Sequence, residues 1–186
     1  MSVIPGAQWS GSSSRAGSRP ARGLTLIELL ATISIMVILM MIAVPAFNDA
    51  TLNGKLTSYA NELVSSAYLA RSEAMKRNGA VTLCVTANGS SCMSDADATS
   101  RRWERGWIVR ASDGTVIHRQ EALKAGFVVG SSVSRLDFQP SGVGASAAAT
   151  LTICRNAPTS GALEKVVAIS ATGQAMVDTT HNGSCP

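Results

Sequence analysis

Residues 21–47 read ARGLTLIELLATISIMVILMMIAVPAF, a long apolar run with one acidic residue, Glu28. Residues 24–44 number 21, which is enough for a helix to cross about 30 Å of hydrocarbon at about 1.5 Å per residue. Glu28 is the only charge among them. A carboxylate costs about 2.5 to 3.5 kcal/mol at the bilayer centre and less near a helix end. Glu28 is therefore either tolerated near the membrane surface or held by a partner.

The segment before this run, residues 1–23, is rich in Ser, Gly and Arg and contains no acid. It has no hydrophobic periodicity, so we expect it to be disordered. Its three arginines explain most of the formal charge of +4, since 13 basic and 12 acidic residues remain without them. The sequence pI of about 9.1 is therefore poor evidence for a nucleic-acid partner. A basic flank before the run predicts a cytoplasmic N-terminus, and no Ala-x-Ala cleavage site follows the run.

Residues 46–78 continue as an amphipathic helix. A single stripe at spacings of three and four contains Leu56, Ala60, Leu63, Ala67, Ala70 and Ala74. Asn78-Gly79 supplies a stop signal. We therefore expect one helix from residue 24 to about residue 78, bent or loosened near Pro45 and Gly54, whose small residues allow a sheet to approach closely.

From Ala80 the hydrophobic period changes. Short runs rich in β-branched or aromatic residues occupy residues 80–86, 106–112, 115–120, 126–130, 134–140, 149–155 and 165–171. Asp113-Gly114, between two of these runs, is the clearest hairpin signal. Residues 79–186 are therefore expected to form an antiparallel β domain of two small sheets packed on the helix, an α+β fold.

Gly23 is followed by Leu-Thr-Leu-Ile-Glu-Leu-Leu, residues 24–30. This junction resembles the class III signal of type IV pilins and type II secretion pseudopilins, in which a prepilin peptidase cuts after the glycine and the new amine is methylated. The resemblance implies cleavage between Gly23 and Leu24, methylation of Leu24, Glu28 at the family's acidic assembly position and a kink at Pro45. It also implies the pilin-like fold, with residues 1–23 a cleaved leader and residues 24–45 a transmembrane and assembly helix.

The resemblance suggests a physical role for Glu28. In a filament, the amine of Leu24 in one subunit would lie beside Glu28 of a neighbour, inside an apolar bundle. Pairing these groups removes the penalty that each would bear alone and fixes the axial register. A catalytic role is much weaker, because no second titratable group accompanies Glu28 in the run.

Three further segments, residues 70–84, 136–144 and 165–177, look like the GspH/FimT branch of pilin-like proteins. The resemblance implies a minor pilin of a type IV pilus, anchored in the inner membrane with a periplasmic C-terminal domain before it enters the pilus. Its partners would be other minor and major pilins, the prepilin peptidase and the inner-membrane assembly platform. The alternatives are a minor pseudopilin of a type II secretion system and a DNA-binding minor pilin for natural transformation. No cofactor is implied.

Four cysteines follow the membrane segment, and sequence alone permits three pairings. In an oxidising periplasm we favour Cys84 with Cys92 and Cys154 with Cys185. A zinc site is disfavoured, because no two cysteines have the close spacing of a metal motif and both histidines are remote in sequence.

No set of residues supports enzyme chemistry. Residues 142–147 fit a loose G-x-G-x-x-A pattern, but the strand-like run that follows leaves no room for the required helix, so we expect a turn there. His118 alternates with apolar residues and is expected to face solvent.

DNA binding rests on two stretches. Some FimT proteins bind DNA through a Gly-Arg-x-Arg motif, but here the corresponding residues 173–176 are Gly-Gln-Ala-Met and lack both arginines. The other stretch is the cluster of Arg101, Arg102 and Arg105, interleaved with Trp103 and Trp107, which would join phosphate contacts to base stacking. The structural alternative is a solvated loop leading into a strand, with Trp107 in the core.

Overall fold

The computed structural model describes residues 23–93, 102–144, 148–156 and 163–181. The chain divides into two compact units, Met1–Val44 and Pro45–Pro186. A single helix, α1 (Leu26–Arg77), contributes to both units, and the strands belong to the second. The helix start and end agree with the prediction to within two residues.

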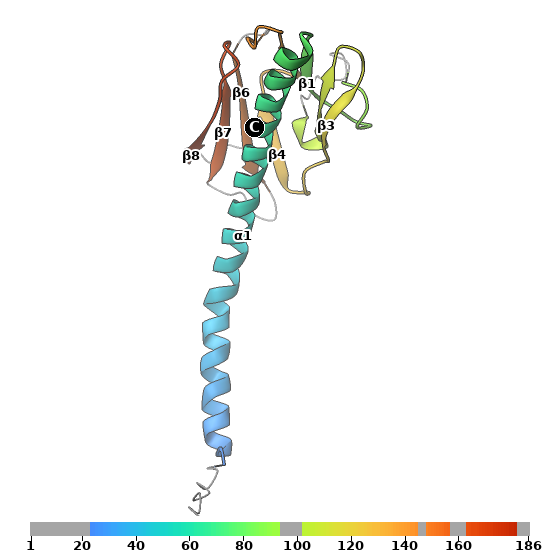
Figure 1. Ribbon diagram of the computed structural model, residues 1–186. Coiled ribbons are helices and arrows are strands. Elements are labelled where there is room, and N and C mark those ends of the chain that lie inside the picture. Colours follow the sequence, from blue (N-terminus) through green and yellow to red (C-terminus); the bar gives the residue numbers. More distant parts are fainter. Residues whose placement is uncertain (1–22, 94–101, 145–147, 157–162, 182–186) are drawn as a thin grey trace, which may run out of the picture. The chain divides into compact units, whose positions relative to one another are not determined.

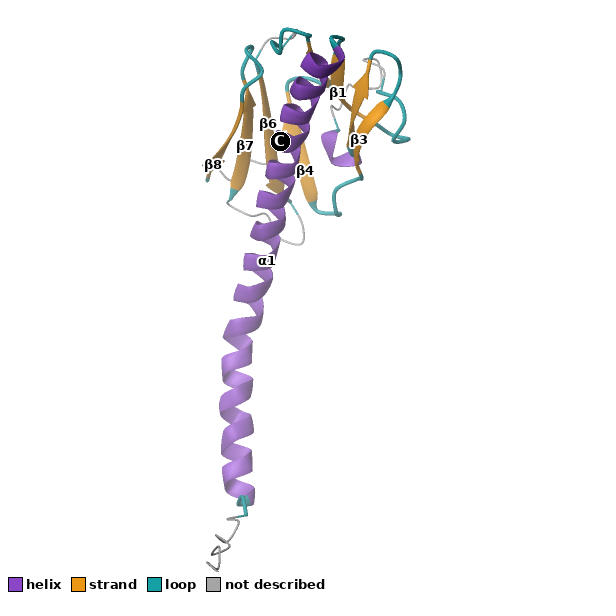
Figure 2. Cartoon of the chain, in the orientation of Figure 1, coloured by secondary structure: helices purple, strands orange, loops and turns teal. Residues whose placement is uncertain are grey.

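The second unit contains two antiparallel sheets, with the second part of α1 crossing them (Figure 1, Figure 2). In spatial order, the first sheet contains β3 (Val116–Gln120), β2 (Trp107–Ala111), β1 (Val81–Val85) and β5 (Arg135–Phe138). The second contains β4 (Phe127–Ser131), β6 (Ala149–Arg155), β7 (Glu164–Ile169) and β8 (Ala175–Thr180). A short 3₁₀ helix, η2 (Trp103–Arg105), precedes β2. The α+β architecture is the one that the sequence predicts.

Each of the seven predicted runs contains a strand, but β8 was not predicted. Ala175 is the only residue of β8 that is buried. The strand pairs with β7 alone, so it lies at the edge of its sheet. An edge strand with so few buried side chains gives no clear alternation of apolar and polar residues, which explains why the pattern was missed.

The hairpin between β2 and β3 is confirmed. Its turn contains Gly114 at a φ of 93°, a backbone conformation that strongly favours glycine. The Thr115 amide donates a 2.8 Å hydrogen bond to Asp113 Oδ1 inside the turn. The pairing register shifts between Val109 and Arg110, so a bulge lies close to the hairpin end.

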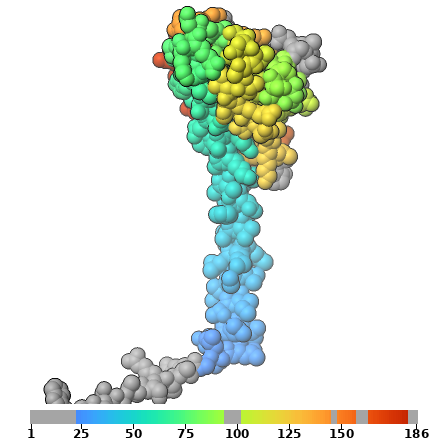
Figure 3. Space-filling model, turned by 45° about the vertical axis from the view of Figure 1, so that its right-hand side comes forward, coloured from blue at the N-terminus to red at the C-terminus, as the bar shows by residue number. Residues whose placement is uncertain are grey.

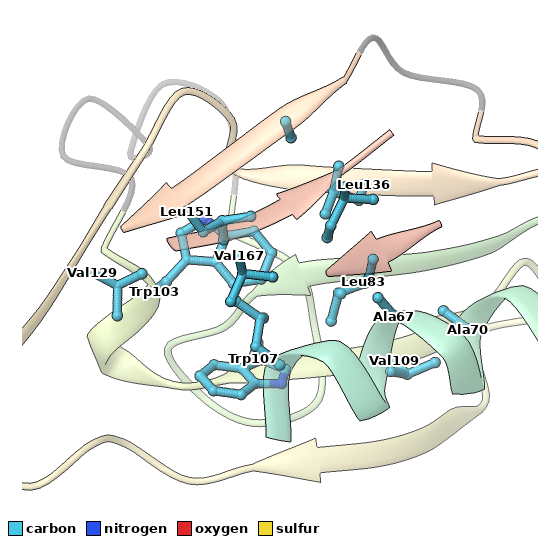
Figure 4. Packing of buried hydrophobic residues seen from close by; sticks show 14 of the residues in the cluster. Ala67, Ala70, Leu83, Trp103, Trp107, Val109, Val129, Leu136, Leu151 and Val167 are labelled. Carbon is cyan, nitrogen blue, oxygen red and sulfur yellow. The ribbon is translucent and has the colours of Figure 1, made fainter. Parts of the chain in front are cut away.

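The second part of α1 packs on the sheets through the predicted stripe. All six stripe residues are buried, and Ser66 joins them. Figure 4 shows Ala67 and Ala70 near Leu83 and Val109 of the first sheet, together with Trp103 and Trp107. Small helix residues permit this close approach, and the large tryptophans fill the remaining space.

His118 does not face open solvent as expected. It pairs with Val109 in the sheet, and its Nε2 lies 2.9 Å from Glu62 Oε1 on α1. Both side chains are about one-third exposed, so the contact lies at the rim of the helix–sheet interface. Strict alternation along the strand predicted the wrong side of the sheet for His118. The bulge before Arg110 shifts which residues of β2 and β3 are opposite each other.

The C-terminus of α1 is closed by a Schellman motif. Asn78 has a φ of 49°, and the amides of Asn78 and Gly79 donate to the carbonyls of Met75 and Ala74. In the last turn, hydrogen bonds from Arg77 and then Lys76 hold the pKa of the Glu73 carboxyl below its usual value. The predicted stop at Asn78-Gly79 therefore has a defined backbone geometry.

Candidate functional site

The N-terminus of α1 is capped by Thr25. The Glu28 amide donates a 3.3 Å hydrogen bond to Thr25 Oγ1, and the Leu29 amide donates to the Thr25 carbonyl at 3.1 Å. Because α1 begins at Leu26, Thr25 is the N-cap and Glu28 the third helical residue. This spacing is that of a capping box, a local signal that the sequence contained and that our reading of Glu28 missed.

The carboxylate of Glu28 has no partner within the part of the chain that the structure describes. Glu28 is exposed, and its side chain makes no hydrogen bond or ion pair with any residue that the structure describes. A carboxylate in the first turn is favoured by the helix dipole, worth about 0.3 to 1 kcal/mol at an exposed site. That gain is smaller than the cost of a lone charge at the bilayer centre. The local cap therefore satisfies the backbone amide of Glu28, but no described residue pairs with its carboxylate.

The segment of α1 that contains Glu28 is apolar on every side. All residues from 23 to 51 are exposed in the isolated chain, and Figure 3 shows the segment in blue. Among the described residues, α1 is the one helix long and apolar enough to cross a membrane. The hydroxyls of Thr32 and Ser34 donate to carbonyls within the helix at 2.8 Å, which satisfies them without water. This surface is compatible with lipid or with a bundle of similar helices.

Gly23 precedes the helix and is not required by packing. A Cβ built on Gly23 would meet no atom within 4 Å. Its φ also lies outside the positive range that favours glycine. Nothing within the described chain therefore explains why a glycine stands at this junction, whereas a second molecule that approaches the backbone closely would explain it.

Pro45 lies inside α1 at the division between the two units. A proline has no amide hydrogen, so one carbonyl of the preceding turn loses its helical partner. The helix nevertheless continues through Pro45 in the structure. Gly54, the second position where we expected loosening, also lies within the continuous helix and is exposed.

The structure contains a disulfide between Cys84 and Cys92, with the two Cα atoms 5.5 Å apart. Cys84 lies on β1, and the loop that ends at Cys92 returns to pair with Thr86. Cys154 on β6 is also disulfide-bonded. Its expected partner, Cys185, lies outside the described residues.

The arginine–tryptophan cluster is not arranged for base stacking. Trp103 and Trp107 are fully buried, and their indole nitrogens donate to the Val133 carbonyl at 2.8 Å and to Ser66 Oγ at 2.9 Å. Arg102 and Arg105 are exposed at the two ends of η2. Arg101 lies outside the described residues. The tryptophans are therefore core residues, in agreement with the structural alternative for Trp107.

The stretch that corresponds to the DNA-binding motif of some FimT proteins has a structural role. Gly173 forms a turn at a φ of 75°, and the chain then enters β8 at Ala175. Tyr68 on α1 donates a 2.8 Å hydrogen bond to the Ala175 carbonyl. Arg71 Nη1 lies 3.5 Å from the Gly173 carbonyl. Side chains of α1 therefore hold this turn through the backbone carbonyls of the turn.

Comparison with known proteins agrees with this geometry. The sequence model of a family described as type II transport protein GspH matches residues 59–173. A prokaryotic N-terminal methylation motif matches residues 18–44, which include Gly23, Leu24 and Glu28. A search of curated protein sequences gives no match.

Two solved structures are similar to this chain. The type IV minor pilin FimU of Pseudomonas aeruginosa is 22% identical and has a TM-score of 0.52, with 73% of this chain and 96% of that chain covered. The minor pseudopilin EpsH of the Vibrio cholerae type 2 secretion system is 13% identical and has a TM-score of 0.46, with 70% and 99% covered. The likeness to FimU supports a pilin-like fold and decides nothing finer.

Proposed function

Because the chain belongs to the GspH family of pilin-like proteins, we propose that it is a minor pilin of a type IV pilus, which is incorporated into the filament or primes it. The prepilin peptidase would cut between Gly23 and Leu24, and the amine of Leu24 would be methylated. The helix would anchor the protein in the inner membrane with its β domain in the periplasm, until the assembly platform adds it to other minor and major pilins.

One observation carries this proposal: no residue that the structure describes pairs with the Glu28 carboxylate, which lies in a segment that is otherwise apolar on all sides. Cleavage after Gly23 would create an amine four residues before Glu28, and that amine would also lack a partner. Between neighbouring helices, the amine of one subunit and the carboxylate of the next would neutralise each other. Assembly would therefore remove the free-energy cost that the amine and the carboxylate each have when they are alone in hydrocarbon.

A minor pseudopilin of a type II secretion system is the second candidate, because the matching family is described as a type II transport protein. Both candidates would use the same leader, anchor and assembly contact. They differ in the machine that the subunit enters, so the structure of the subunit supports them equally.

A deletion strain separates the two candidates. If the protein is a minor pilin, deletion reduces surface pili and an epitope-tagged copy is recovered in sheared filaments, while secretion of exoproteins is unchanged. If it is a pseudopilin, exoproteins accumulate in the periplasm and pili remain. Normal pili together with normal secretion would contradict both.

A further inference from the structure

The outer face of the first sheet is basic. Strand alternation directs Leu83, Val109 and Leu136 into the core, whereas Thr82, Arg110 and Asp137 stand side by side across the sheet on the other face. Four arginines lie on or beside this outer face, from η2 and three different strands: Arg105, Arg110, Arg119 and Arg135. We call these four residues the arginine face.

The disulfide loop, residues 86–92, lies on this same outer face. Cys84 and Ile108 belong to the outer side of β1 and β2, yet they are only 1% and 0% exposed. Arg119 Nη2 donates a 3.1 Å hydrogen bond to the Asn88 carbonyl. Gly89 has a φ of 71°, and a Cβ there would collide with the Arg119 guanidinium. The loop is therefore fixed to the sheet by the disulfide and by an arginine.

Two hollows flank the loop. The larger, of about 430 Å³, is lined by Cys92 together with Thr82, Arg110, Arg135, Asp137 and Gln139, among others. The smaller, of about 230 Å³, is lined by Asn88, Arg105, Arg119 and Glu121, among others. The charged residues that line the two hollows are four arginines and two carboxylates, an excess of two positive charges.

Among the described residues that line the larger hollow, Arg110 is the one whose charge no carboxylate neutralises. Arg135 Nη2 lies 2.9 Å from Asp137 Oδ1, so these two charges largely cancel. Arg110 is half-buried, and its Nε donates to the Gly114 carbonyl at 3.3 Å. No carboxylate of a described residue forms an ion pair with Arg110. A half-buried guanidinium held by a neutral carbonyl has capacity for an anionic partner.

We propose that the arginine face is a docking surface for a carboxylate-bearing face of a neighbouring filament subunit, with Arg110 as the main contact. This inference rests on the proposed function, since it requires assembly. Asp137 and Glu121 lie among the arginines, so the surface has charges of both signs. A protein face can place carboxylates against the arginines and cations or neutral groups against Asp137 and Glu121, whereas a phosphate backbone is negative throughout. Trp103 and Trp107 are buried and offer no ring for base stacking. The charge pattern therefore complements a protein surface of the opposite sign better than a nucleic acid.

Such a contact would influence how neighbouring subunits align and which subunit binds next to this one. Charges at the rim of an interface contribute more to encounter rate and specificity than to affinity. A subunit whose facing side carried lysines or arginines would be rejected. The arginine face would thus select the position that this subunit takes among the other subunits.

The test uses the full chain in its own membranes, with a photo-crosslinking amino acid in place of Gln139, which lines the larger hollow. The variants are Arg110→Glu, the conservative Arg110→Lys, and the control Lys76→Glu. Lys76 is 76% exposed at the end of α1 and lies outside the arginine face, so the control makes the same charge change elsewhere. We expect a crosslink to another pilin-like subunit that falls at least fivefold in Arg110→Glu, with little change in the other two.

Membrane abundance of each variant is measured in parallel. If Arg110→Glu is unstable, the wild-type crosslink decides the matter, because it must weaken between 50 and 500 mM salt if the contact is electrostatic. A salt-independent crosslink, equal yields from wild type and Arg110→Glu, a crosslink to nucleic acid, or no crosslink would each overturn the inference. Absence of the wild-type protein from any filament would instead contradict the proposed function.

Discussion

Trp107 Nε1 donates a 2.9 Å hydrogen bond to the hydroxyl of Ser66, and both residues are buried. This bond joins the first strand after η2 to the middle of the buried stripe of α1. An indole N–H inside a core needs an acceptor, and a small serine in the stripe provides it without separating helix from sheet. The contact therefore fixes both the distance and the register between α1 and β2.

Ser66→Ala is expected to lower the free energy of unfolding by about 1 to 3 kcal/mol, because it leaves a buried indole donor without a partner. The measurement is urea unfolding of the full chain in detergent, followed by tryptophan fluorescence. Ser65→Ala is the matched control, since Ser65 is the exposed neighbour, and its effect should stay within about 0.5 kcal/mol. Equal effects of the two substitutions would show that the Ser66 hydroxyl is dispensable.

Replacing Cys84 and Cys92 together with serine should destabilise the protein by about 2.5 kcal/mol, because the disulfide closes a loop with a sequence separation of 8. Non-reducing digestion and mass spectrometry should also find Cys154 joined to Cys185, a longer loop for which we expect about 3.5 kcal/mol. Peptides that link Cys84 or Cys92 to either of the other cysteines would contradict this pairing.

Arg155 is buried with its side chain 7% exposed, and both terminal nitrogens lie within 3.2 Å of Asp49 Oδ1 on α1. Asp49→Asn should destabilise the protein by about 1 to 3 kcal/mol, because the buried guanidinium loses its counter-charge, while Asp49 itself is 62% exposed. Arg155→Met should cost less, since it removes the buried charge as well. A double-mutant cycle measured by thermal unfolding would give no coupling if the pair contributes nothing.

Much of the fold could be predicted, because its elements depend on local patterns. The stripe from Leu56 to Ala74 correctly predicted the buried side of α1, and Asp113-Gly114 correctly predicted the hairpin. The Ser66–Trp107 bond was not predictable, since a serine in an apolar stripe has no pattern that names a partner 41 residues away. The predicted side of His118 was wrong, because a pattern of strict alternation does not reveal a bulge.

The candidate site was partly accessible from the sequence. Glu28 stands out as the only charge in the apolar run, and Gly23 and Leu24 stand out because they form the junction between the basic segment and that run. The arginine face was missed, because Arg105, Arg110, Arg119 and Arg135 are spread over 31 residues and come together only through the strand order of the first sheet. The sequence drew attention to Arg101, Arg102 and Arg105 instead, which are close only along the chain.

Glu28→Ala and Glu28→Gln should insert into the membrane normally, since loss of a charge favours insertion. Their incorporation into sheared filaments should fall at least tenfold, because the amine of a neighbouring subunit would lose its counter-charge. Thr25→Ala is the control, as it removes the helix cap but keeps the carboxylate. Incorporation that falls as far in Thr25→Ala as in Glu28→Gln, or that does not fall in Glu28→Gln, would contradict a specific role for the Glu28 charge in assembly.

The most direct test of the account is the intact mass of this protein recovered from sheared surface filaments. We predict a chain that begins at Leu24, carries one added methyl group and lacks four hydrogens because two disulfides have formed. Gly23→Leu should leave the full-length precursor in the membrane fraction, since the peptidase would no longer approach the backbone. A mature protein that retains residues 1–23, or that begins at any residue other than Leu24, would contradict the account.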